Sequence, residues 1–228
     1  MPMDKIMKKL LLPCLILFVA VLGCSKFREL AGGSSNSSGG GTGGSSKGTA
    51  TSGADPKADV IEASKKFLTI PSYTAHMQGS GSQGDLKYQL EYSQPDKYHM
   101  TYQGGPGSGM EMIAIGSNMY TKMGGKWMKS PGDAKAIGSS RDAFTDEGLK
   151  TLSDVTFDGN DTVDGRSAQV YKYKNVTPTG GFGYNCKMWV SSDKGLPMKL
   201  VCEYDNGMLK QMTVTYDLET PVTIEAPI

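Results

Sequence analysis

The sequence predicts an α+β domain over residues 55–228, in which a long antiparallel sheet buries one face against helices. Three observations predict this class. Apolar and polar residues alternate along much of the region, which is typical of strands with a single buried face. One strong helical pattern precedes the strands. Short turns that contain Gly or Pro separate the strand patterns, and such turns join antiparallel neighbours.

Residues 1–23 have the pattern of an export signal. Lysines precede an apolar stretch of 13 residues, Leu10–Leu22, which is too short to span a ~30 Å hydrocarbon core as a helix. The stretch runs into Val21-Leu22-Gly23-Cys24, which resembles the lipobox of bacterial lipoproteins, where the cysteine is diacylated and becomes the first mature residue. We therefore expect Cys24 to carry a lipid anchor that ties the protein to a membrane. The alternative is an ordinary signal peptide, which leaves Cys24 as an exposed thiol.

Residues 24–54 are predicted to form the lipidated cysteine and a disordered tether. The stretch Gly32–Gly53 is rich in Gly and Ser and has no large apolar side chain to offset the entropy of ordering. About 30 flexible residues have an r.m.s. reach of roughly 30 Å, so we expect the folded part to stand clear of the lipid surface. Ser25 resembles the outer-membrane sorting signal of Gram-negative bacteria. In a source without an outer membrane, the anchor would lie in the plasma membrane.

The first ordered element is predicted to be a helix over roughly Pro56–Thr69. Asp55 is suited to cap it, and Pro56 fits the first helical position because its missing N–H is not needed there. Apolar and small residues recur on one face of this helix at helical spacing: Val60, Ile61, Ser64, Phe67 and Leu68. A second, weaker helical pattern lies near Ser140–Leu152 and is interrupted by Gly148.

Two strand patterns follow the helix, over residues 86–93 and 98–103. Their apolar face carries Leu86, Tyr88, Leu90 and Tyr92 on the first strand and Tyr98, Met100 and Tyr102 on the second. Turns are predicted at Gln94-Pro95-Asp96, between these strands, and at Gly124-Gly125 further along the chain.

The C-terminal third predicts two hairpins in register. The apolar stripes are Tyr184, Cys186, Met188 and Val190, then Met198, Leu200, Cys202 and Tyr204. A three-residue loop, Asp193-Lys194-Gly195, with Gly in the left-handed conformation pairs residue 192 with 196 and Cys186 with Cys202. A second three-residue loop at Asp205-Asn206-Gly207 pairs Leu200 with Met212 and Met198 with Val214.

A disulfide between Cys186 and Cys202 is therefore expected. Exported proteins meet an oxidising compartment, and these two thiols are all that remain once Cys14 is removed with the signal and Cys24 is acylated. The predicted register places them opposite each other, within the reach of a disulfide. The alternative is a pair of buried free cysteines.

The composition argues against several classes of function. The formal net charge is +1, whereas a nucleic-acid-binding protein needs a clustered excess of Lys and Arg. Two histidines and four cysteines leave little material for catalysis or a zinc site, so we expect no enzyme, no catalytic residue, no metal and no cofactor. A Cu(I) site on methionines is disfavoured because no dense Met cluster is visible. The Gly-rich run 104–109 lacks the Lys-Ser/Thr of a phosphate loop.

Short motifs between residues 115 and 199 resemble the LolA/LolB superfamily of periplasmic lipoprotein carriers, and more closely its LppX/LprG-like branch of lipid-binding lipoproteins. They are Ile115-Gly116, Tyr120, Gly124-Gly125-Lys126-Trp127, Trp189-Val190, Asp193, Gly195-Leu196-Pro197 and Lys199. The ending Val222-Thr223-Ile224-Glu225-Ala226-Pro227 is similar to the closing strand of that group. The resemblance implies a half-open antiparallel barrel of about ten strands around a helical lid, with an apolar cavity between them. The long tether and the Cys186/Cys202 pair depart from the pattern.

We expect the apolar side of the sheet to border this cavity, through Leu86, Tyr88, Leu90, Tyr98, Met100, Met110, Met112, Met188, Leu200 and Met212. The corresponding function is a membrane-anchored envelope lipoprotein that binds or carries a hydrophobic ligand, such as an acyl chain, a lipid or a lipoprotein. Two alternatives remain. One is a non-enzymatic sensor or interaction module that binds an envelope protein, and the other is a surface or structural lipoprotein without a ligand.

Overall fold

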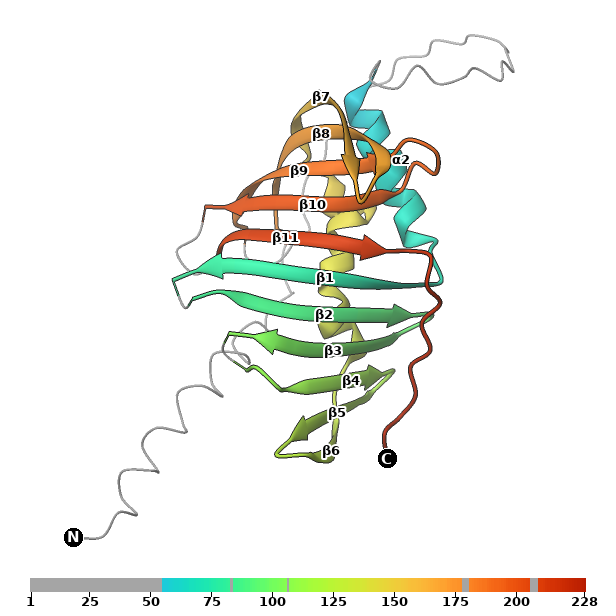
Figure 1. Ribbon diagram of the computed structural model, residues 1–228, viewed down its shortest axis with the longest axis vertical. Coiled ribbons are helices and arrows are strands. Elements are labelled where there is room, and N and C mark those ends of the chain that lie inside the picture. Colours follow the sequence, from blue (N-terminus) through green and yellow to red (C-terminus); the bar gives the residue numbers. More distant parts are fainter. Residues whose placement is uncertain (1–54, 83, 106, 178–180, 206–208) are drawn as a thin grey trace, which may run out of the picture. The chain divides into compact units, whose positions relative to one another are not determined.

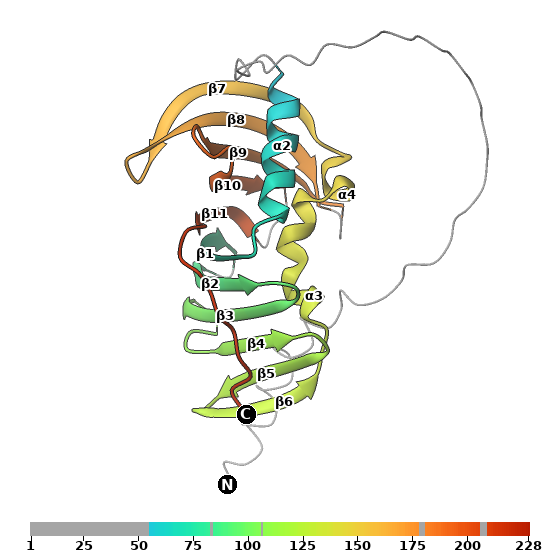
Figure 2. The ribbon, with the colours of Figure 1, turned by 90° about the vertical axis from the view of Figure 1, so that its right-hand side faces the viewer.

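The computed structural model describes residues 55–82, 84–105, 107–177, 181–205 and 209–228. They form an eleven-stranded antiparallel sheet with its helices on one face (Figure 1, Figure 2). The strand order is β6-β5-β4-β3-β2-β1-β11-β10-β9-β8-β7, and the sheet is not closed. The predicted α+β class, a half-open antiparallel barrel with a helical lid, is therefore confirmed, with eleven strands where about ten were expected. The predicted signal and tether, residues 1–54, lie outside the described residues.

The strands are β1 (Ser72–Gly81), β2 (Leu86–Ser93), β3 (Lys97–Gly104), β4 (Glu111–Ile115), β5 (Asn118–Met123), β6 (Lys126–Pro131), β7 (Ser153–Val163), β8 (Arg166–Val176), β9 (Gly183–Ser191), β10 (Pro197–Tyr204) and β11 (Leu209–Asp217). The helices are α2 (Pro56–Leu68), α3 (Ala134–Ile137), the 3₁₀ helix η2 (Gly138–Phe144) and α4 (Asp146–Leu149). In the described part of the chain, none of these helices has the length and apolar character needed to cross a membrane.

Helix α2 matches the prediction within one residue. The Asp55 side chain accepts a hydrogen bond from the Ala58 N–H at 3.0 Å and so caps the first turn. Its inward face buries Val60, Ala63 and Phe67. The helix lies beside the β7–β11 half of the sheet (Figure 2), and its burial supplies the stability that a 13-residue helix lacks by itself.

The second helical region begins earlier than predicted and is divided into three short pieces, α3, η2 and α4. Gly148 lies within α4 and is not a simple interruption. A Cβ atom at Gly148 would overlap the carbonyl oxygen of Asp142 and lie 2.8 Å from backbone atoms of Ala143. This glycine therefore allows η2 and α4 to pack closely, which a pattern of apolar residues does not reveal.

The hairpin of β9 and β10 has the predicted register at its centre and a different loop at its end. Cys186 lies opposite Cys202, as predicted. The loop is one residue longer than predicted, because Ser191 N–H bonds to the Leu196 carbonyl at 2.9 Å. A register shift in β10 between Pro197 and Lys199 absorbs the extra residue. Met198 consequently packs on the opposite face of the sheet, and its predicted place beside Leu200 and Cys202 was wrong.

The predicted register of β10 and β11 was wrong by two residues. Leu200 pairs with Val214, and Cys202 pairs with Met212. A shift of two residues leaves the face of each side chain unchanged, since strand side chains alternate with period two. Met212 and Val214 therefore remain on the helix-bearing face despite the wrong partners.

The C-terminal segment is not the predicted closing strand. None of the residues from 218 to 228 is in a strand. The segment instead crosses the face opposite the helices (Figure 2), where Ile224 packs against Ile113 and Tyr120.

Candidate functional site

Aromatic rings fill the helix-bearing face where α2 meets the sheet. Phe67 of α2 is 1% exposed. Its ring centroid lies 4.9 Å from that of Tyr73, 4.6 Å from that of Phe144 and 4.9 Å from that of Tyr216. These distances are typical of packed aromatic pairs, so this part of the face is a protein core.

A second part of the same face, toward the other ends of the strands, is only half-buried. Tyr88 of β2 pairs with Tyr102 of β3, and their rings stack at 5.7 Å. Met100 of β3 pairs directly with Met112 of β4. We call this region the tyrosine–methionine face and define it by its half-buried members, Leu86, Tyr88, Met100, Tyr102, Met110, Met112, Tyr204 and Met212.

Gly79 of β1 lies at the centre of this region. It pairs with Leu86 of β2 on one side and with Met212 of β11 on the other. A Cβ atom at Gly79 would lie 3.2 Å from the Cε of Met212, so the methionine occupies space that a larger residue would take. Because methionine is flexible and polarizable, this surface can adapt to an apolar ligand of variable shape.

The tyrosines of this face are held in a poorly hydrated setting. Burial raises the pKa of Tyr88 well above its ordinary value, and the neighbouring Tyr102 and Tyr204 add to that effect. Burial also raises the pKa of Tyr102 and of Tyr204. Their hydroxyls therefore stay neutral, and the face carries no ionised tyrosine at physiological pH.

The structure divides the ten residues predicted to border a cavity into two groups. Leu90, Tyr98, Met188 and Leu200 are buried members of the core. The other six are half-buried: Leu86, Tyr88, Met100, Met110, Met112 and Met212. Tyr102 and Tyr204 share this surface and were not among the ten, although the same strand alternation places both on it.

Two surface hollows lie elsewhere. One, of about 640 Å³, involves the hairpin of β7 and β8 and is lined by Asn160, Asp161, Thr162, Ser167, Ala168, Gln169 and Ser192. The other, of about 350 Å³, is lined by His76, Asp164, Arg166, Thr215, Tyr216, Asp217 and Glu219. None of the ten predicted residues lines either hollow. Most of the residues that line the two hollows are polar or charged, which does not suit a hydrophobic ligand.

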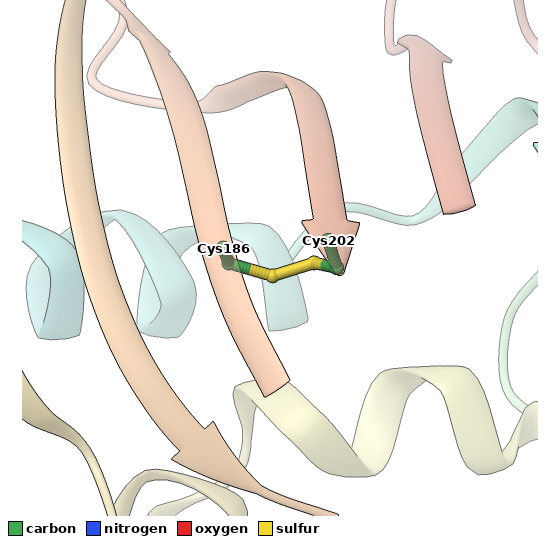
Figure 3. The surroundings of a disulfide bond; sticks show 2 residues. All are labelled: Cys186 and Cys202. Atoms are coloured by element: carbon green, nitrogen blue, oxygen red, sulfur yellow. A yellow bond between two sulfur atoms is a disulfide. The ribbon is translucent and has the colours of Figure 1, made fainter. Parts of the chain in front are cut away.

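Cys186 and Cys202 are joined by a disulfide, and their Cα atoms lie 4.2 Å apart (Figure 3). Both residues belong to the buried core on the helix-bearing face. Their role in the structure is to fix the β9–β10 register next to Tyr184 and Tyr204, whose ring centroids are 5.5 Å apart. The predicted lipidation site, Cys24, lies outside the described residues.

A polar network on the opposite face was not foreseen. His99 lies between two carboxylates, with Nδ1 2.8 Å from Glu91 and Nε2 3.0 Å from Glu111. Lys122 lies 2.8 Å from Glu111. The hydrogen bonds from Lys122 and His99 lower the pKa of Glu111. Among the described residues, no cluster of His, Cys, Asp and Glu is suited to a metal ion.

No protein-family model and no curated protein sequence matches the chain. Solved structures do. LprF from Mycobacterium bovis matches with a TM-score of 0.56 and 16% identity, covering 75% of this chain and 96% of its own. The Mycobacterium tuberculosis lipoprotein LppX matches with a TM-score of 0.55 and 14% identity, covering 75% and 98%. A LolA superfamily protein from Nitrosomonas europaea matches 71% of this chain and 91% of its own length at 8% identity. Its TM-score of 0.29 shows only a weak likeness. The described part of this chain therefore shares the fold of LppX and LprF, as the resemblance of its sequence motifs implies.

Proposed function

We propose that this protein is a membrane-anchored lipoprotein of the bacterial envelope that binds a hydrophobic ligand, an acyl chain or lipid, on the tyrosine–methionine face. The observation that carries the proposal is a contiguous apolar surface, half-buried beside the helices, on the side of the sheet that also holds the core. The likeness to LppX and LprF supports the fold on which this surface lies. The proposal involves binding and no catalytic step.

The energetics of such binding are those of hydrophobic burial. Each CH₂ group removed from water contributes about 0.8 kcal/mol, so a chain that covers this surface gains affinity with length. Half-buried side chains have already lost part of their hydration and part of their freedom of movement. Less conformational entropy is therefore lost when a ligand orders them than when it orders fully exposed side chains.

The anchor belongs to the same proposal. A lipidated Cys24 and the tether to residue 54 would hold the domain near a membrane, most simply the outer membrane, while leaving its face open to lipid or to a lipoprotein. Such an arrangement suits a carrier or receptor of apolar molecules within the envelope.

The test is titration of a fluorescent fatty-acid analogue into the chain beginning at Ser25, produced without its signal. We expect saturable binding of one analogue per chain. Met100→Gln should weaken it, because it places a polar group on the face. Thr101→Gln is the matched control, since Thr101 is the adjacent half-buried residue of β3 and points to the opposite face. Equal effects of the two variants, or no binding at all, would contradict the proposal.

A second candidate, an interaction module for an envelope protein, is favoured by a different observation. The rings of Phe67, Tyr73, Phe144 and Tyr216 already fill the part of the face where α2 meets the sheet. If the fatty-acid analogue fails to bind while the protein is folded, this candidate takes precedence.

A further inference from the structure

Arg141 of η2 occupies an unusual position on the helix-bearing face. The carbon at the centre of its guanidinium lies 4.0 Å from the centroid of the Tyr92 ring, and 5.6 Å from those of Phe67 and Tyr73. Its Nη2 donates a hydrogen bond to the Leu68 carbonyl, in the last turn of α2, at 2.9 Å. Aromatic faces and a helix C-terminus both favour a cation, so the structure holds this guanidinium firmly in place.

Within the described ranges, no carboxylate forms an ion pair with this guanidinium. Its Nη1 is buried and has no hydrogen-bond partner in the described part of the chain. None of the described carboxylates lies within ion-pair distance of it. Arg166, the other arginine in the described ranges, lies 3.3 Å from Glu219 and so has such a partner. An arginine is always charged, and a buried N–H without an acceptor costs free energy.

The Tyr73 hydroxyl is near enough to be influenced by this charge. Burial raises the pKa of Tyr73 to about 12, and Arg141 opposes the shift. A neutral phenol and three ring faces do not supply the negative charge that a half-buried guanidinium favours. The surroundings therefore orient Arg141 and, among the described residues, give its Nη1 no acceptor.

Arg141 lies at one end of a row of residue pairs on β2 and β3 that leads to the tyrosine–methionine face. On β2 and β3 the pairs Tyr92–Tyr98, Leu90–Met100 and Tyr88–Tyr102 follow one another on the same face. Each step along the strands is two residues, or about 6.6 Å. The guanidinium above Tyr92 is thus about 13 Å from the stacked tyrosine pair, and Leu90 and Tyr98, which lie between them, are buried in the core, so a bound chain has to lie over or displace the groups that cover them.

We propose that Arg141 binds the anionic headgroup, a carboxylate or phosphate, of an amphiphile whose apolar chain lies on the tyrosine–methionine face. This inference rests on the proposed function and specifies its ligand class. The headgroup supplies the acceptor for Nη1, and the chain follows the line of pairs away from it. A charge-assisted hydrogen bond to a fixed arginine makes the site select acids over neutral lipids with the same chain.

The experiment compares hexadecanoate with hexadecan-1-ol, which share a chain and differ in headgroup charge, on the chain beginning at Ser25. We expect the acid to bind roughly ten- to a hundredfold more tightly than the alcohol. Arg141→Gln should remove this preference while leaving the affinity for the alcohol unchanged. Arg166→Gln is the matched control, because it removes one positive charge from a residue outside the face and should retain the preference.

The outcomes separate the inference from the function on which it rests. If neither ligand binds the wild type, the proposed function fails. If both bind equally well, or if Arg141→Gln keeps the preference, only the headgroup assignment is overturned. Acetate alone should not compete, and competition by acetate would show a free-anion site instead.

Should Arg141→Gln fail to fold, the wild type decides the question by NMR of its arginine side-chain nitrogens. Signals of one arginine, other than those lost in Arg28→Gln and in Arg166→Gln, should move with hexadecanoate and not with hexadecan-1-ol. Signals that stay unchanged at saturation with hexadecanoate would overturn the inference.

Discussion

Replacing Phe67 by alanine should strongly destabilise the domain, since this one ring joins α2, the sheet and η2. Phe67 is 1% exposed and contacts the rings of Tyr73, Phe144 and Tyr216 at 4.6–4.9 Å. Truncation removes those contacts and leaves a cavity, which for a buried Phe→Ala change costs about 3–5 kcal/mol. For a domain of this size each kcal/mol lowers the melting temperature by about 2–4 °C, so we expect a loss of about 6–20 °C.

The assay is thermal unfolding followed by far-UV circular dichroism, together with urea unfolding at one temperature. Phe182→Ala is the matched control, because Phe182 is 50% exposed and should change stability by less than about 0.5 kcal/mol. A loss below about 1 kcal/mol for Phe67→Ala would refute the view that the helix is held on the sheet by this ring cluster.

Three further predictions concern the disulfide, the anchor and the acid network. Ellman titration of the unfolded, unreduced protein should find no free thiol at Cys186 and Cys202, and reduction should cost about 3 kcal/mol of stability; two free thiols would contradict the bond. Cys24→Ser should block lipid-coupled cleavage and fatty-acid labelling and release the protein from membranes, and a wild type without label would disprove the anchor. The lowered pKa of Glu111 means that its contribution to stability is present above its ordinary pKa and is lost as pH falls through the lowered value. Glu111→Gln should therefore lose less melting temperature between pH 7 and pH 3 than the wild type, and an equal loss would place the acid sensitivity elsewhere.

The elements that the sequence predicts well are those controlled by local chemistry. Helix α2 follows from a capping Asp, a proline at the first helical position and one apolar stripe, all within 14 residues. The Cys186–Cys202 register was predicted correctly although the loop is one residue longer than predicted, because the register shift in β10 absorbs the extra residue. Even the wrong register of β10 and β11 kept Met212 on the correct face, since an error of two residues preserves alternation.

The features that escaped prediction depend on contacts between distant segments. Nothing near Met198 in the sequence signals the register shift that moves it to the other face. Apolar alternation marks Leu90 and Met100 equally, yet the first is buried in the core and the second is half-buried, because only the tertiary packing of the helices distinguishes them. The place of Arg141 against Tyr92 likewise joins segments about fifty residues apart.

NMR of the methionine methyl groups is the most direct test of where a hydrophobic ligand binds, because methionines lie on both faces of the sheet. On titration with hexadecanoate, the methyl signals of Met100, Met112 and Met212 should move and saturate together. Met198, buried on the opposite face, should not move. Movement of Met198 while those three stay fixed, or no movement at saturating ligand, would contradict a ligand site on the tyrosine–methionine face.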